Sequence, residues 1–264
     1  MVTRIHPEPA QPALPADLAA LSAITSDAYR QVKDRLREVI TRLGEEGRLR
    51  LPSEAELSTA LGVSRATLRS ALQSLQKEGR IRRLHGHGTF INRHALGLGA
   101  NLAEAGAFMD LLTEAGHQAT VSTADQRVVP LDADMAASLE IPAGEQALRI
   151  ERVFAASGAP AVHSVDHFPV RLLGDDPRAL EATQSTFEFV ERHIGPPVCY
   201  SVAEVRPVLP PAEVATALKI PATQPLLRLR HTHIQADEQP VAVTVVHVND
   251  EYLRFSVIRT YLDE

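Results

Sequence analysis

Residues 51–91, LPSEAELSTALGVSRATLRSALQSLQKEGRIRRLHGHGTFI, hold the densest set of local structure signals in the chain. Ser53 followed three residues later by Glu56 is a capping box, in which each residue satisfies a backbone amide at the start of a helix. This pair predicts that a helix begins at about Glu54. Gly62 breaks the helical pattern, so the helix is short and a tight turn follows it.

A second helix is predicted over about 65–78, because Ser64 is a suitable N-cap and Gly79 a suitable residue to follow the end. Its apolar residues recur at helical spacing on one face: Leu68, Ala71, Leu72 and Leu75. Its opposite face is polar near the N-terminal end: Arg65, Thr67, Arg69 and Ser70. Two helices joined by a three-residue turn form a helix-turn-helix.

A β-hairpin is predicted to follow directly. Residues 80–84 are typical of a strand, 85–88 (His-Gly-His-Gly) of its turn, and 89–92 of the returning strand. A hairpin behind a helix-turn-helix is a wing. Its candidate contacts with the DNA backbone or minor groove are Arg82, Arg83, His85 and Gly86.

The combined pattern predicts DNA binding. In a helix-turn-helix the second helix enters the major groove with its N-terminal end first. Arginine forms paired bonds with guanine, and threonine contacts phosphate or a thymine methyl group. The candidate contacts on the helices are Ser53, Ser64, Arg65, Thr67 and Arg69. The alternative is a helical pair with a merely solvated basic face, which leaves the agreement of cap, turn and glycine-rich hairpin unexplained.

The motif LPSE-EL-LGVSR-TLR-AL-L-EG-HGHGTF resembles the winged-helix domain of GntR-type bacterial transcription regulators over about 29–91. The resemblance implies that Ser64, Arg65, Thr67 and Arg69 contact an operator, with His85 and Gly86 at the wing tip. The family often has an arginine after the LPSE glutamate, whereas this chain has Ala55. Its base preference is therefore expected to differ from that of typical members.

Charge is distributed unevenly along the 264 residues. Residues 26–96 carry 14 Lys/Arg against 8 Asp/Glu, a balance of +6, within a chain whose net charge is -6. The rest therefore carries -12, and a basic module on an acidic remainder suits local phosphate binding. Cys199 is the single cysteine, which fits a reducing compartment. With no apolar run long enough for a membrane span and no signal-peptide pattern, we expect a cytoplasmic protein.

We expect four segments in chain order. Residues 1–25, with four prolines followed by an Ala/Leu-rich run, form a mobile N-terminal extension. The winged helix-turn-helix occupies 26–93, and its first helix starts at Ser26. Glycines among alanines indicate a linker over 94–106, and 107–264 form the second domain, which begins with a helix over 107–115.

The second domain contains an internal repeat. Residues 131–153, LDADMAASLEIPAGEQALRIERV, match 210–232, PPAEVATALKIPATQPLLRLRHT, at a constant offset of 79, which pairs Arg149 with Arg228. Each copy predicts a short helix, a proline turn and a strand that continues into a hairpin. Between the copies we predict a helix over 186–194 and a strand over 198–208. A last strand is predicted over 256–262.

These elements predict an α+β fold, an antiparallel sheet covered by helices with approximate two-fold symmetry. The arrangement is similar over about 105–262 to the UTRA effector-binding domain of the HutC subfamily, which has a chorismate-lyase-like fold. The residues that carry this resemblance are Phe108 with Gly116, the strand over 149–152, and Asp250-Glu251-Tyr252-Leu253-Arg254-Phe255. The resemblance implies a homodimeric regulator, most often a repressor, whose operator binding a metabolite controls.

The candidate effector-binding residues lie on the predicted strands and the helix before them. Alternation places Ile150, Arg152 and Phe154 on one strand face, which is where the family holds anionic effectors. The full set is Phe108, Arg152, Phe154, Ser164, Asp166, Thr244 and His247. We expect Arg152 to lack a fixed partner and to bind a small anionic or zwitterionic metabolite. The alternative is a surface ion pair of Arg152 with Glu151 or Glu204.

Members of the family that bind aminosugar phosphates tend to have Arg-x-Arg where this chain has Arg152-Val153-Phe154. They also tend to have glutamate at the place of Ser164, and Ser-Phe-Thr where this chain has Ala107-Phe108-Met109. These three departures argue against an aminosugar phosphate as the effector.

Two other functions stay open. The first is a metal-responsive regulator that uses His231, His233 and His247, and the second is an effector-free protein whose second domain only dimerises. His163 and His167 are about 13 Å apart along one strand, too far for a single zinc ion. The residues contain no catalytic constellation and no cofactor motif, so we expect no enzyme activity.

Overall fold

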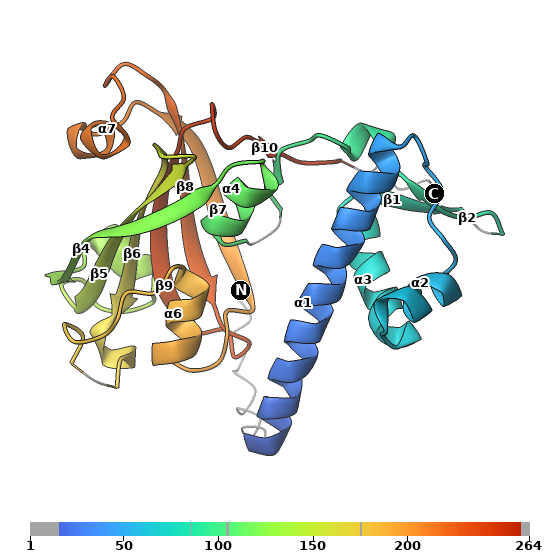
Figure 1. The fold of residues 1–264 in the computed structure, drawn as a ribbon. Coiled ribbons are helices and arrows are strands. Elements are labelled where there is room, and N and C mark those ends of the chain that lie inside the picture. The colour runs from blue at the N-terminus through green and yellow to red at the C-terminus, as the bar shows by residue number, and fades with distance from the viewer. Residues whose placement is uncertain (1–15, 85, 104–105, 175, 260–264) are drawn as a thin grey trace, which may run out of the picture. The chain divides into compact units, whose positions relative to one another are not determined.

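The structure, a computed structural model, describes residues 16–84, 86–103, 106–174 and 176–259. The chain divides into two compact units (Figure 1), one up to Gly97 together with the residues from Ile258, the other Leu98–Val257. We describe each unit by itself. The mobile extension was expected for residues 1–25, and residues 1–15 of it lie outside the described residues. No helix in the described part of the chain is long and apolar enough to cross a membrane.

The first unit begins with helix α1, Ala16–Glu45. We expected this helix to start at Ser26, and that boundary was wrong, because the Ala/Leu-rich run before it continues the same helix. Helices α2, Glu54–Leu61, and α3, Arg65–Lys77, follow as predicted. The capping box is present, since the Ser53 amide donates to Glu56 Oε2 at 2.7 Å and Ser53 Oγ accepts from the Glu56 amide at 3.3 Å.

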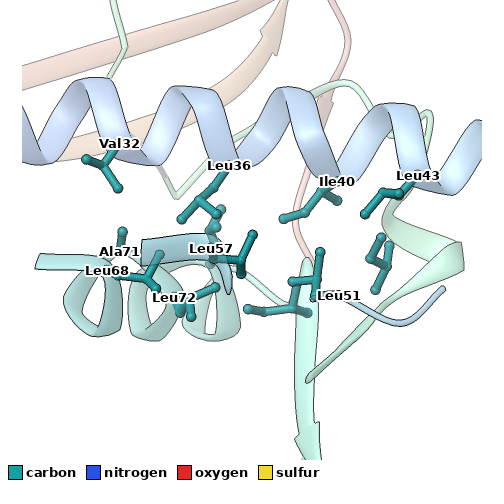
Figure 2. Packing of buried hydrophobic residues seen from close by; sticks show 12 residues of the cluster. Val32, Leu36, Ile40, Leu43, Leu51, Leu57, Leu68, Ala71 and Leu72 are labelled. Carbon is teal, nitrogen blue, oxygen red and sulfur yellow. The ribbon is translucent and has the colours of Figure 1, made fainter. Parts of the chain in front are cut away.

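Helix α1 packs lengthwise on α2 and α3 (Figure 2). Its side chains Val32, Leu36, Ile40 and Leu43 are buried against Leu57 of α2 and the apolar face of α3, which consists of Leu68, Ala71, Leu72 and Leu75. A buried carboxylate reinforces the contact, because Glu78 pairs with Lys33 of α1 at 2.7 Å. This packing holds the polar face of α3 outward.

The predicted wing is present. Strands β1, Ile81–Leu84, and β2, Gly88–Ile91, pair antiparallel, with Arg82 opposite Phe90. A 3-10 turn, η1, spans Arg93–Ala95. The wing therefore extends directly from the end of the recognition helix α3.

A six-stranded antiparallel sheet in the order β4-β5-β6-β9-β8-β7 forms the centre of the second unit. Its strands are β4 Ala119–Pro130, β5 Gln146–Ala156, β6 Ala159–Pro169, β7 Tyr200–Val208, β8 Leu226–Ile234 and β9 Pro240–Val248. Five helical segments accompany them: α4 Phe108–Glu114, α5 Ala133–Ser138, η2 Val170–Leu172, α6 Thr186–His193 and α7 Ala212–Leu218. The fold class is α+β, as predicted.

The internal repeat corresponds to a real pseudo-symmetry of this sheet. The two copies pair through β6 and β9, with Val165 opposite Val245 at the centre. Arg149 lies opposite His167 in the first half, and Arg228 lies opposite His247 in the second, so the two arginines occupy equivalent places. The prediction for the repeat is confirmed.

Strand β4 was not predicted, although the repeat extends to it. Arg127 of β4 pairs with Arg149, as Arg206 of β7 pairs with Arg228, and the offset is again 79 residues. β4 is an edge strand whose side chains are largely exposed, so its sequence lacks a clean apolar alternation.

Helices cover both faces of the sheet. Leu112 of α4 packs on Phe154, and Phe189 of α6 packs on Phe168, stacked at 4.2 Å between ring centroids. The opposite face is covered by α5, whose Ala136 packs with Ala147 and Val243. α7 contributes Val214 and Leu218 to a further small cluster. We call the face under α4 and α6 the pocket face.

The last predicted strand differs from the structure. In this region the only strand among the described residues is the two-residue β10, Phe255–Ser256. It pairs in parallel with the short β3, Ala100–Asn101, and does not join the main sheet. Residues 260–262 of the predicted strand lie outside the described part of the chain. The two segments that connect the units therefore run side by side where they enter the second unit.

Leu36→Ala should destabilise the first unit by about 2–5 kcal/mol, because Leu36 is fully buried against α2 and α3 and its removal leaves a cavity. Arg35→Ala, one position away on the exposed side of α1, is the control and should change stability by roughly 0.5 kcal/mol or less. Urea unfolding measures both. Equal stability of the two variants would show that α1 does not pack as described.

Candidate DNA-binding surface and effector pocket

The N-terminal end of α3 presents the predicted base-contacting residues. Ser64 Oγ accepts from the Thr67 amide at 3.1 Å, so Ser64 is the N-cap. The Thr67 hydroxyl lies 2.8 Å from Ser64 Oγ and is half-buried. Arg65 and Arg69, one helical turn apart, are both exposed beside the buried leucine face of the helix. This geometry lets both arginines project into a major groove.

Glu54 connects the recognition helix with the wing. Its Oε2 accepts from Arg69 Nε at 2.7 Å, and its Oε1 lies 3.2 Å from Arg83 Nη2. The bond and charge of Glu54 raise the pKa of Arg69. From the sequence we predicted only that a helix begins at about Glu54. In the structure it also orients Arg69 through Nε, which leaves the two terminal nitrogens of that guanidinium for a base edge.

The wing residues lie mostly at the surface. Arg82 is exposed on β1, and Gly86 and Gly88 take the left-handed conformation, with φ of +73° and +105°, that the tight turn requires. Arg50, which we did not predict, forms a bridge with Phe90 and holds its guanidinium 6.0 Å from that ring's centroid. The predicted contact His85 lies outside the described residues.

A pocket opens on the pocket face of the second unit, between the sheet and the segments that carry α4 and α6. The space between its walls, with the open solvent at its mouth, is about 650 Å³. Five of the predicted effector residues line it: Phe108, Arg152, Phe154, Ser164 and Thr244. The remaining lining residues are Leu102, Gly106, Ala107, Leu111, Ser185, Thr186, Phe187, Ser201, Leu229, His231, His233 and Phe255.

Arg152 is buried and ion-paired, which contradicts our expectation that it lacks a fixed partner. Its side chain is 1% exposed, and Nη1 bonds to Asp166, which is fully buried on the neighbouring strand. Its Nε donates to the Thr183 carbonyl at 2.8 Å. A buried guanidinium needs such a partner, because desolvation of an unpaired charge is very costly. The surface pairing with Glu151 or Glu204 is wrong as well.

One donor of Arg152 stays unsatisfied. Nη2 is buried and has no hydrogen-bond partner in the described part of the chain. Arg152 also lines the pocket, so this unsatisfied charged donor belongs to a pocket-lining side chain.

Asp166 does not line the pocket but organises the residues that do. Its Oδ1 accepts from Thr186 Oγ1 at 2.7 Å and from Thr244 Oγ1 at 2.6 Å. The Thr244 hydroxyl has one proton, and that proton goes to the carboxylate. The Thr244 oxygen, 2.8 Å from His233 Nε2, therefore accepts, which fixes His233 as the Nε2–H tautomer. His233 Nδ1 then accepts from Ser201 Oγ at 2.8 Å.

Burial keeps the pocket histidines neutral. Burial, followed by the charge of His231, lowers the pKa of His233 to about 4, and burial also lowers the pKa of His231. The two rings stack with centroids 5.7 Å apart. His231 lines the pocket, and the described residues give its ring no hydrogen-bond partner.

His247 was wrongly assigned to the effector site. β-Strand alternation places Thr244 and Val246 on the pocket face and His247 on the opposite face, where its ring lies 6.1 Å from that of His163. For the same reason His247 cannot join His231 and His233 in a metal site. Among the described residues, no group of three or more His, Cys, Asp or Glu side chains is placed to hold a metal ion.

Sequence reasoning missed the residues that the tertiary fold brings to the pocket. Thr186 and Phe187 come from the start of α6, Ser201 from β7 and Phe255 from β10. The one usable signal was Ser185, whose hydroxyl caps α6 by accepting from the Glu188 amide at 3.1 Å. That cap predicts the helix but not which face of the sheet the helix covers.

Two family models match the chain. Residues 26–91 match the model described as bacterial regulatory proteins, gntR family, and residues 114–254 match the UTRA domain. Together they cover both units that carry the candidate sites.

Named relatives and solved structures agree with these matches. The repressor NagR of Bacillus subtilis is 26% identical over 204 residues, 77% of this chain and 83% of NagR. The Escherichia coli repressor MngR of mannosyl-D-glycerate transport and metabolism is 26% identical over 200 residues, 75% and 82% of the two chains. In fold, the chain is similar to the possible transcriptional regulator YydK of B. subtilis. The TM-score is 0.66 at 20% identity, over 88% of this chain and 99% of YydK.

Arg65→Ala and Arg69→Ala should each weaken operator binding by about 1–3 kcal/mol and relax preference at one base position, because both residues lie exposed at the groove end of α3. Lys77→Ala, at the other end of the same helix, is the matched control. Fluorescence anisotropy with specific and scrambled duplexes measures affinity and preference. Wild-type selectivity in both arginine variants would contradict the assigned face.

Glu54→Gln should raise the affinity for scrambled DNA and lower the selectivity for the operator. Removing its negative charge strengthens binding to scrambled DNA, while Arg69 and Arg83 lose the carboxylate that orients them. The ratio of specific to scrambled affinity should therefore fall in the same anisotropy assay. An unchanged ratio would show that Glu54 does not orient the arginines that contact DNA.

The second unit should lose stability between pH 6.5 and 5. Burial lowers the pKa of His167, His233 and His247 to about 4, so the unfolded chain binds more protons than the fold below pH 6.5. The stabilisation that depends on these neutral rings is fully present above pH 6.5 and is lost toward pH 4. By pH 5 the loss is roughly 2 kcal/mol for His233, and it is smaller for His247, whose ring is less deeply buried. Urea unfolding at several pH values measures the slope, which should be shallower in His233→Gln. A flat profile would contradict neutral burial.

Proposed function

The chain belongs to the gntR family of bacterial regulatory proteins, in the group that carries a UTRA domain, and from that membership we propose how it works. It is a transcription regulator and not an enzyme. The relatives and fold neighbours named above are likewise named as transcription regulators. We propose that it is a cytoplasmic repressor whose affinity for an operator is set by a small molecule in the second unit. Two relatives are named repressors, which supports the proposal that this chain represses transcription.

The DNA-binding form is a homodimer in this proposal. One winged helix supplies a single recognition helix, and the exposed arginines Arg65 and Arg69 contact only a few base pairs. Two copies related by a two-fold axis recognise two half-sites, so the operator is a near-palindrome.

The observation that best supports effector control is the pocket itself, preformed around a buried ion pair with one unsatisfied donor, Arg152 Nη2. Protein interiors rarely leave a buried donor of this strength unpaired. An acceptor on a bound molecule satisfies this donor, whereas an effector-free dimerisation domain leaves both the pocket and its unpaired donor unexplained.

The pocket also adjoins both connections between the units. Leu102 follows β3 and Phe255 lies in β10, and both line the pocket. Two residues beyond β10, the side chain of Ile258 packs on Gly79 at the end of the recognition helix, since a Cβ added at Gly79 would lie 2.5 Å from it. A ligand that moves Leu102 or Phe255 therefore pulls on the segments that lead to the DNA-binding unit, which couples the two sites.

Selection from a random duplex pool tests the DNA side of the proposal. Wild type should enrich one near-palindromic sequence, and Arg65→Ala should fail to enrich it. Sedimentation with the selected duplex should give two chains per duplex. Enrichment of no sequence, or one chain per duplex, would overturn the proposed function.

A further inference from the structure

The pocket has no net charge when empty. Arg152 is the one full cation among its described lining residues, and Asp166 directly behind it balances that charge. Of the two lining histidines, His233 is buried and His231 is half-buried, and the remaining lining residues are apolar, glycine or hydroxyl-bearing. Such a site does not offer the excess of cations that a phosphate dianion requires.

The walls of the pocket are largely aromatic. Four of the seven phenylalanines in the chain line it: Phe108, Phe154, Phe187 and Phe255. Leu102, Leu111 and Leu229 add aliphatic surface. These side chains match an apolar or aromatic body far better than a hydroxylated sugar.

Two polar side chains lie at places related by the pseudo-symmetry. The offset of 79 residues relates Arg152 of β5 to His231 of β8, and both line the pocket. Arg152 has an unpartnered Nη2, and the described residues give neither ring nitrogen of the pocket-lining His231 a hydrogen-bond partner. Strands β5 and β8 are three strand spacings apart, roughly 14 Å. Arg152 and His231 therefore line the same pocket from opposite sides.

We infer that the effector is an organic monoanion with an apolar body, such as a small aromatic carboxylic acid, and that it binds together with one proton taken up by His231. This inference rests on the proposed function and names the ligand class of the same pocket. The anion accepts from Arg152 Nη2, and the apolar body lies among the phenylalanine rings.

Proton uptake follows from charge balance. A monoanion in a neutral, buried site leaves one uncompensated negative charge, and protonation of His231 cancels it. The titratable groups that act on His231 are His233, stacked on it, and Asp166, while Arg152 lies on the far side of the pocket beside Asp166. Its strand neighbours Ala203 and Thr244 do not titrate. In the empty pocket burial lowers the pKa of His231, so it is uncharged before the anion enters.

Calorimetry on the full-length protein tests the inference with four probes. Phenylacetate is the apolar monoanion, and 2-phenylethanol has a similar body without charge. Phenyl phosphate carries nearly two charges at pH 8, and glucosamine 6-phosphate is an aminosugar phosphate. Phenylacetate should bind most tightly of the four. Its Kd should rise by up to tenfold per pH unit as pH increases from 6 to 8, because one proton binds with it.

Variants identify the residues. His231→Gln keeps a hydrogen-bonding group but cannot titrate, so phenylacetate should bind more weakly with a Kd that no longer depends on pH. Arg152→Lys keeps the charge beside Asp166 and should weaken binding further, with folding checked by circular dichroism. His94→Gln, an exposed histidine of the first unit, is the matched control and should behave like wild type.

Tighter binding of either phosphate, or no binding of phenylacetate, would overturn the ligand class. A pH-independent Kd in wild type, or an unchanged pH dependence in His231→Gln, would overturn proton uptake at that residue. Each of these results leaves the operator selection untouched, so a failure here is distinct from a failure of the proposed function.

Discussion

The carboxylate of Asp166 is the constraint on which the second unit depends. This carboxylate is fully buried and neutralises Arg152 on β5. It also accepts hydrogen bonds from Thr186 on α6 and from Thr244 on β9. These three elements come from different parts of the repeat. A charge at this depth is tolerated only when every lone pair finds a donor. The three donors therefore fix the register of the strands and the place of α6. The same bonds fix the tautomer of His233 through Thr244.

The first unit depends on shorter-range forces, and for that reason the sequence predicted it well. The caps at Ser53 and Ser64 and the turn at Gly62 lie within a few residues of the groups they bond. Only the start of α1 was misplaced, because nothing in an Ala/Leu-rich run marks where such a helix begins. The role of Glu54 was missed, since its contact with Arg69 spans 15 residues and a change of element.

In the second unit the repeat predicted the sheet, but not the partners of its buried charges. Arg152 and Asp166 were both placed in the site from strand alternation, and Asp166 was still not recognised as the partner of Arg152. That pairing depends on the β5–β6 register, which a bulge at Phe154/Ala155 shifts. His247 was misassigned to the pocket, although its separation of three residues from Thr244 places the two side chains on opposite faces of the strand. The exposed edge strand β4 gave no periodic signal at all.

The central claim is that Asp166 prepares an electrically neutral pocket before any ligand arrives. ¹⁵N NMR of histidine-labelled protein tests it most directly, because the two ring nitrogens report both charge and tautomer. We predict that at pH 7 the His233 ring is neutral with its one proton on Nε2, and that Asp166→Asn alters its signals. An imidazolium at His233 at pH 7, or a neutral ring with the proton on Nδ1, would contradict it.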